Sequence, residues 1–130
     1  MISVISAGLG AAAVVNELAL LVNIKERLCR VPYCKRCYDT SVQLTTEYSA
    51  GTPVLKDSSV FVPITAIVSA ITSGTCNRAN TQTFKETFVV AFQGQTALPS
   101  SVTIENLGSI QDSDRCEASI SDSIAVTLVA

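Results

Sequence analysis

Apolar and polar residues alternate along most of the chain after residue 39, with the two-residue period of a β-strand. The stretches with this period are rich in β-branched and aromatic residues. Their alternating positions are Val42, Leu44, Thr46 and Tyr48; Val60, Val62 and Ile64; Phe84, Phe88, Val90 and Phe92; Val102 and Ile104; Ile120, Ile124, Val126 and Leu128. Turn-forming residues separate them at 49–53, 72–81, 93–101 and 108–114. The pattern predicts a mainly β fold, a small antiparallel β-sandwich or jelly-roll-like domain, in which Pro63 marks an edge or a bulge.

The first 24 residues are almost wholly apolar and predict a different element. From Val14 onward the apolar residues fall on one face of a helix. Small residues before them would allow a close approach between backbones. We therefore predict an N-terminal apolar helix or arm over residues 1–28, and its packing residues are Ala12, Val14, Val15, Leu18, Leu21 and Val22.

Three packing arrangements are open for this arm: against its own domain, against neighbouring copies, or in a lipid bilayer. A removed signal peptide is disfavoured because no basic residue precedes the apolar run and no cleavage site follows it. The uninterrupted run from Ile2 to Val15 is also shorter than the roughly 20 residues of a membrane span. We expect a retained segment.

A short basic, cysteine-rich collar at residues 29–38 separates the arm from the predicted domain at 39–130. Residues 39–130 are acidic, with nine acids and four bases. The basic residues in and beside the collar are Lys25, Arg27, Arg30, Lys35 and Arg36. They suit lipid headgroups or a solvated junction between helix and sheet. Binding of nucleic acid is open but disfavoured, because the basic count is low.

Five cysteines allow several chemistries: Cys29, Cys34, Cys37, Cys76 and Cys116. A zinc site would need Cys29, Cys34 and Cys37 with one remote cysteine, whereas a redox site at the CxxC would need a helix after it, where the sequence predicts a strand. Disulfides are the third alternative, and an odd count leaves one thiol free or bonded to another chain. Disulfides, unmodified thiols and zinc all stay open.

Acidic residues supply two further candidates for a site. Asp112, Asp114, Glu117 and Asp122 form a cluster without the spacing of an EF-hand, so we expect a solvated loop. Glu86 shares the strand face of Phe84 and Phe88, so its carboxylate needs a partner, for which Arg78 and Arg115 are candidates.

Composition disfavours catalysis and favours assembly. The chain has no His, no P-loop and no dinucleotide-binding glycines, and we expect no enzyme activity, cofactor or metal. With 48% hydrophobic and only 15% charged residues, much of the surface is neutral. The leading hypothesis is a structural, self-assembling subunit of a virion, pilus-like fibre or other extracellular filament, whose arm packs against copies of itself. The alternatives are a membrane-anchored β-sandwich binding module and a Cys-dependent redox or zinc protein.

Overall fold

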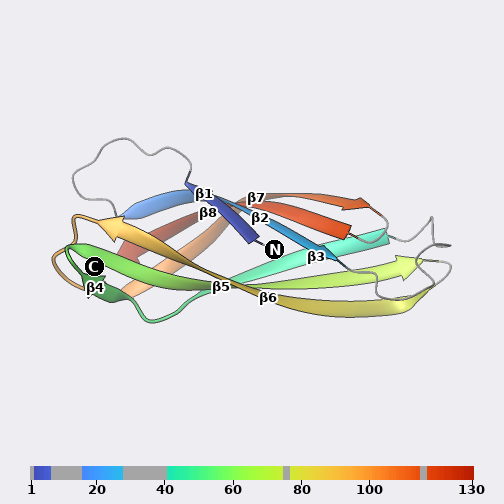
Figure 1. Ribbon diagram of the computed structural model, residues 1–130, viewed down its shortest axis with the longest axis horizontal. Coiled ribbons are helices and arrows are strands. Elements are labelled where there is room, and N and C mark those ends of the chain that lie inside the picture. The colour runs from blue at the N-terminus through green and yellow to red at the C-terminus, as the bar shows by residue number, and fades with distance from the viewer. Residues whose placement is uncertain (1, 7–15, 28–40, 75–76, 115–116) are drawn as a thin grey trace.

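A computed structural model describes residues 2–6, 16–27, 41–74, 77–114 and 117–130, and every regular element in them is a β-strand (Figure 1). The strands are β1 (Ile2–Ser6), β2 (Glu17–Arg27), β3 (Ser41–Ala50), β4 (Val54–Lys56), β5 (Ser59–Gly74), β6 (Asn77–Gln93), β7 (Ser101–Asp114) and β8 (Glu117–Val129). The predicted mainly β character is therefore confirmed.

The strands form two antiparallel sheets that face each other in two layers (Figure 1). The β2/β8 sheet has the order β1-β2-β8-β7. In the β5/β6 sheet, β5 is central, with β3 and β4 along one edge and β6 along the other. The hairpins β1–β2, β5–β6 and β7–β8 each stay within one sheet, so the chain changes layer between β2 and β3 and between β6 and β7.

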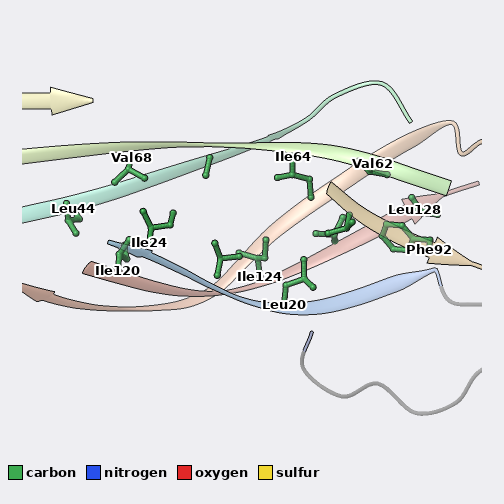
Figure 2. Close-up of a cluster of buried hydrophobic side chains, with 14 of the residues drawn as sticks. Leu20, Ile24, Leu44, Val62, Ile64, Val68, Phe92, Ile120, Ile124 and Leu128 are labelled. Atoms are coloured by element: carbon green, nitrogen blue, oxygen red, sulfur yellow. The ribbon is translucent and has the colours of Figure 1, made fainter. Parts of the chain in front are cut away.

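The core lies between the two layers because alternate side chains of each strand point inward. Figure 2 shows Leu20, Ile24, Ile120 and Ile124 of one sheet facing Ile64 and Val68 of the other. Burying each such side chain contributes about 1.5–3 kcal/mol. The buried apolar residues are Leu20, Val22, Ile24, Leu44, Val60, Val62, Ile64, Ala66, Val68, Ala70, Val90, Phe92, Ala118, Ile120, Ala125, Ile124, Val126 and Leu128.

The predicted N-terminal helix is not found, because both described segments of that region are strands. Strand β2 pairs with β8 along its whole length, from Glu17↔Thr127 to Arg27↔Glu117, and β1 pairs with its other edge. Leu18 and Val22, placed by the prediction on a helical face with Leu21, also belong to an alternating set that includes Leu20 and Ile24. Pairing with β8 selects the two-residue period, buries that set and leaves Leu21 on the outer face.

A β-bulge in β7 reverses which of its side chains face the core. The register passes from Asn106↔Ile124 to Gly108↔Ser123, so Leu107 is the extra residue. Before the bulge Val102 and Ile104 point inward, whereas after it Ser109 and Gln111 do. Ile110 is consequently turned outward and is 77% exposed.

The prediction that Pro63 marks an edge or a bulge is wrong, because Pro63 lies within the central strand β5 and the pairing with β6 shows no register shift there. A proline in such a strand ordinarily removes a ladder hydrogen bond. Strand β3 ends opposite Ile64 and β4 begins opposite Phe61, so Pro63 faces the gap between them. Its carbonyl oxygen accepts a hydrogen bond from the Gly51 N–H at 2.7 Å on that side. The missing N–H of Pro63 therefore falls where neither β3 nor β4 offers a partner, which explains why the strand continues.

Candidate functional site

A buried carboxylate between the two sheets organises the most elaborate polar site among the described residues. Asp122 lies on the inner face of β8 and is fully buried. Its Oδ2 accepts hydrogen bonds from Thr46 Oγ1, at 2.8 Å, and from the Tyr48 hydroxyl. Its Oδ1 accepts one from Ser109 Oγ at 2.5 Å. These four residues, which we call the Asp122 cluster, join β8 to β3 of the opposite sheet and to β7 of its own.

The electrostatics of this cluster keep the tyrosine neutral. Burial, followed by the hydrogen bond and the negative charge of Asp122, raises the pKa of the Tyr48 hydroxyl above its usual value. Three hydroxyl groups donate to the one carboxylate, so both of its oxygens are engaged within the protein. The arrangement suits a fixed link between the layers better than proton transfer to a bound molecule.

Gln111 makes a second polar link between β7 and β3. Its Oε1 accepts from the Leu44 N–H at 3.0 Å, and its Nε2 donates to the Leu44 carbonyl oxygen at 2.7 Å. The side-chain amide thus pairs with backbone at the β3 edge as another strand would. The Asp122 cluster and Gln111 together fasten the β3 edge of one layer to β7 of the other.

Glu86 also lies at an inward position, and one of its hydrogen-bond partners is another acid, Glu26. Burial and then a hydrogen bond with Glu86 raise the pKa of Glu26, whereas the same hydrogen bond holds the pKa of Glu86 below its usual value. A hydrogen bond between two carboxyl groups needs a proton on one of them, and the opposite directions of the two pKa shifts favour Glu26 as the group that carries it. The side chains of the predicted partners Arg78 and Arg115 lie outside the described residues.

The acidic stretch predicted to be a solvated loop is in fact divided between strands β7 and β8. Asp122 is buried, and Glu117 forms an ion pair with Lys25 of β2 at 3.1 Å. Both partners of that pair are substantially exposed, so its contribution is about 0–1 kcal/mol. The sequence did indicate that Asp122 points inward, because it lies between Ile120 and Ile124 in the alternating set of β8.

Of the predicted arm, collar and cysteine residues, the structure describes only some. Leu18 and Val22 of the predicted arm pack within their own protomer. Ala12, Val14, Val15, Arg30, Lys35, Arg36 and all five cysteines lie outside the described residues, and so do the predicted boundaries at 28 and 38. Arg27 ends β2, and its side chain is outside the described part.

The described residues on either side of the cysteines lie at one end of the two layers. Arg27 is paired with Glu117, and Ser41 with Ser73. The bonds between Gln111 and Leu44 bring the end of β7 close to the beginning of β3. The described residues that flank the cysteine-containing segments, at 27 and 41, 74 and 77, and 114 and 117, therefore all lie at this end.

Other features give little sign of ligand chemistry. Within the described ranges, no three Cys, Asp or Glu side chains lie close enough to hold a metal ion. No helix in those ranges is long and apolar enough to cross a bilayer. An open depression of about 310 Å³ at the opposite end of the layers is lined by residues 94–99, Asn16, Leu128 and Ala130. Main-chain contacts around it, such as Leu128 N–H to Asn16 O at 2.8 Å, fasten the end of β8.

Large apolar side chains gather on the outer face of the β5/β6 sheet. The register puts Val54, Phe61 and Ala91 in one row, with Pro63 and Val89 in the next. All five are exposed, Val89 to 63% and Val54 to 55%. We call these five residues the outer patch; it is contiguous because cross-strand neighbours on one face lie about 5 Å apart.

No family model, curated protein or solved structure matches this chain.

Proposed function

We propose that this chain is a β-sandwich subunit that assembles with copies of itself into a particle or filament. The outer patch carries the proposal. Single exposed apolar side chains are common, but a contiguous group on one sheet face is typical of a surface that another molecule covers. The low charge of the chain agrees, since 15% charged residues leave few groups to keep such a surface solvated.

In this proposal the outer patch, and not the N-terminal arm expected from the sequence, makes the contact between copies. Residues 17–27 form a central strand of the β2/β8 sheet, with Leu18 and Val22 packed in or against its core. A charge at Leu18 would therefore damage the fold of the protomer itself. Surface positions such as Val89 are better tests of assembly, because changing them leaves the core intact.

A sheet fastened on its inner side and apolar on its outer side suits a building block. The Asp122 cluster and Gln111 hold the layers in one relative position through directional hydrogen bonds. Fixed layers keep the outer patch in a constant shape, so an association does not have to order it first.

The test is the mass of the native protein by light scattering, with negative-stain imaging of the same sample. We expect regular assemblies far above the 13.7 kDa of one chain. Val89→Lys should reduce them to small species while circular dichroism and melting temperature stay unchanged. Thr45→Lys is the matched control, because Thr45 is an exposed position on the outer face of β3, in the same sheet but outside the patch and away from β6. A wild-type chain that stays monomeric at all concentrations would overturn the proposal.

A further inference from the structure

The direction of the backbone groups in β6 follows from one hydrogen bond at Pro63. The Pro63 carbonyl oxygen points toward β3 and β4, because it accepts from Gly51 N–H. In an antiparallel strand the N–H and C=O of one residue point to the same side, and the side alternates from residue to residue. Pro63 is paired with Val89, so these two residues form a non-hydrogen-bonded pair and the N–H and C=O of Val89 point away from β5.

The same alternation assigns every backbone group along the strand. Even-numbered residues of β6, such as Phe88, bond with β5, whereas odd-numbered residues direct their N–H and C=O outward. The Leu44 contact checks the assignment, because Leu44 is paired with even-numbered Ala70 and must point away from β5. Its N–H and C=O do point outward, to Gln111. Between residues 81 and 93, the outward-directed residues of β6 are Thr81, Thr83, Lys85, Thr87, Val89, Ala91 and Gln93.

The β6 edge has the properties that normally favour the addition of a strand. Its pairing with β5 runs from Ser59↔Gln93 to Thr72↔Asn80 without a register shift, and residues 80–93 contain no proline. Within the described part of the chain, its outer side has no strand partner. A long, straight edge of this kind is a template for another strand.

The other described edges are blunted or short. At the β3 edge, Gln111 occupies the N–H and C=O of Leu44. The β7 edge is broken by the bulge and carries Glu105 and Asp112, so two copies of it would repel each other. Strand β1 has only five residues. By contrast, residues 81–93 of β6 carry one Lys and one Glu, and two copies have no net charge to separate them.

We infer that the β6 edge pairs with the β6 edge of a second copy of this chain, antiparallel and about a twofold axis, joining two β5/β6 sheets into one. Such an interface uses the same surface on both copies. If the twofold axis passes through Thr87, the midpoint of residues 81–93, this whole segment pairs with the same segment of the second copy, and Thr87 lies opposite Thr87 of that copy. This axis also places Lys85 opposite Val89, whereas axes at residues 85 or 86 would oppose like charges. The inference rests on the proposed self-assembly and names the edge that it uses.

Hydrogen exchange on the wild-type protein tests the pairing directly. In the assembly, the odd-numbered amides from Thr83 to Val89 should exchange on the order of 100-fold more slowly than in protomers dissociated by dilution. The even-numbered amides at Phe84 and Phe88 should be protected in both states, because they bond with β5. Equal exchange of the odd-numbered amides in both states would overturn the inference.

Proline substitution gives a second, independent test. Thr87→Pro removes an outward N–H without removing a bond to β5, so the protomer should keep its β-type circular dichroism while the twofold contact is lost. Thr87→Val is the matched control, since it keeps the N–H, and should assemble as the wild type does. If wild type assembles and Thr87→Pro assembles equally well, the edge inference fails while self-assembly stands. If the wild type is monomeric throughout, both fail.

Discussion

Replacing Asp122 by Ala should reveal how strongly the buried polar cluster holds the two layers together. The carboxylate is fully buried and accepts hydrogen bonds from Thr46, Tyr48 and Ser109. Each hydrogen bond to a charged group is worth about 1.5–3 kcal/mol. Removing the carboxylate also removes its desolvation cost, so the net loss is smaller than the sum. We expect the free energy of unfolding to fall by about 3 kcal/mol, and the melting temperature by roughly 10 °C.

A double-mutant cycle separates this mechanism from a general loss of packing. In the wild-type background, Tyr48→Phe removes one bond to the carboxylate and should cost about 1–2 kcal/mol. In the Asp122→Ala background the tyrosine hydroxyl has lost its acceptor, so the same change should cost nothing or stabilise. The coupling energy between the two changes should therefore exceed about 1 kcal/mol. It is measured from urea unfolding of the four proteins at one pH.

The matched control is Ser123→Ala, one residue along β8 and exposed on the outer face. It should change the free energy of unfolding by less than about 0.5 kcal/mol. If Tyr48→Phe costs as much without Asp122 as with it, the cluster does not act as a unit and the reasoning is refuted.

Four further outcomes are expected. Because the pKa of Tyr48 is raised, its contribution is complete below pH 10 and is lost as pH rises above that value; Tyr48→Phe should flatten this decline in urea midpoints, and an unchanged slope would contradict it. Gln111→Met should lower the free energy of unfolding by about 1 kcal/mol, because the edge backbone that it bonds is partly rehydrated; no loss in urea unfolding would argue against the link. Ser58 has a φ of 63°, a left-handed conformation that glycine adopts more easily, so Ser58→Gly should stabilise the protein by about 0.5–1 kcal/mol, measured as a higher melting temperature. The raised pKa of Glu26 contributes stability that is complete below pH 4.5 and is lost as pH rises above it, so Glu26→Gln should flatten that decline in pH-dependent unfolding, and an unchanged slope would contradict it.

The strands after residue 40 could be predicted where apolar and polar residues alternate, whereas residues 72–74, 77–81 and 108–114, which were predicted as turns, belong to β5, β6 and β7. Val102 and Ile104, for example, alternate with polar residues on either side, a pattern that a helix would spread over different faces. Residues 17–27 carry two periods at once, and nothing local chooses between them. The choice is made by β8, which pairs with Glu17 through Thr127, and such distant partners cannot be read from a single sequence.

The polar links were predictable only in part. Asp122 stands in phase with Ile120 and Ile124, so its inward position follows from the same alternation that identified Glu86. Gln111 could not be found in this way, because the bulge at Leu107 shifts the phase of β7. Without the bulge, alternation from Ile104 would turn Ile110 inward and Gln111 outward.

The pairing of β2 with β8 also has consequences for the order of folding. Strands β3 to β6 are neighbours along the chain and can form their hairpins soon after they are synthesised. The β2/β8 sheet, in contrast, cannot close until residues 117–129 arrive, about one hundred residues after its second strand. Contacts of such long sequence separation make folding slow. During synthesis the edge of β2 that pairs with β8 stays unpaired until the last strand arrives, and in this interval the chain is most exposed to misassembly.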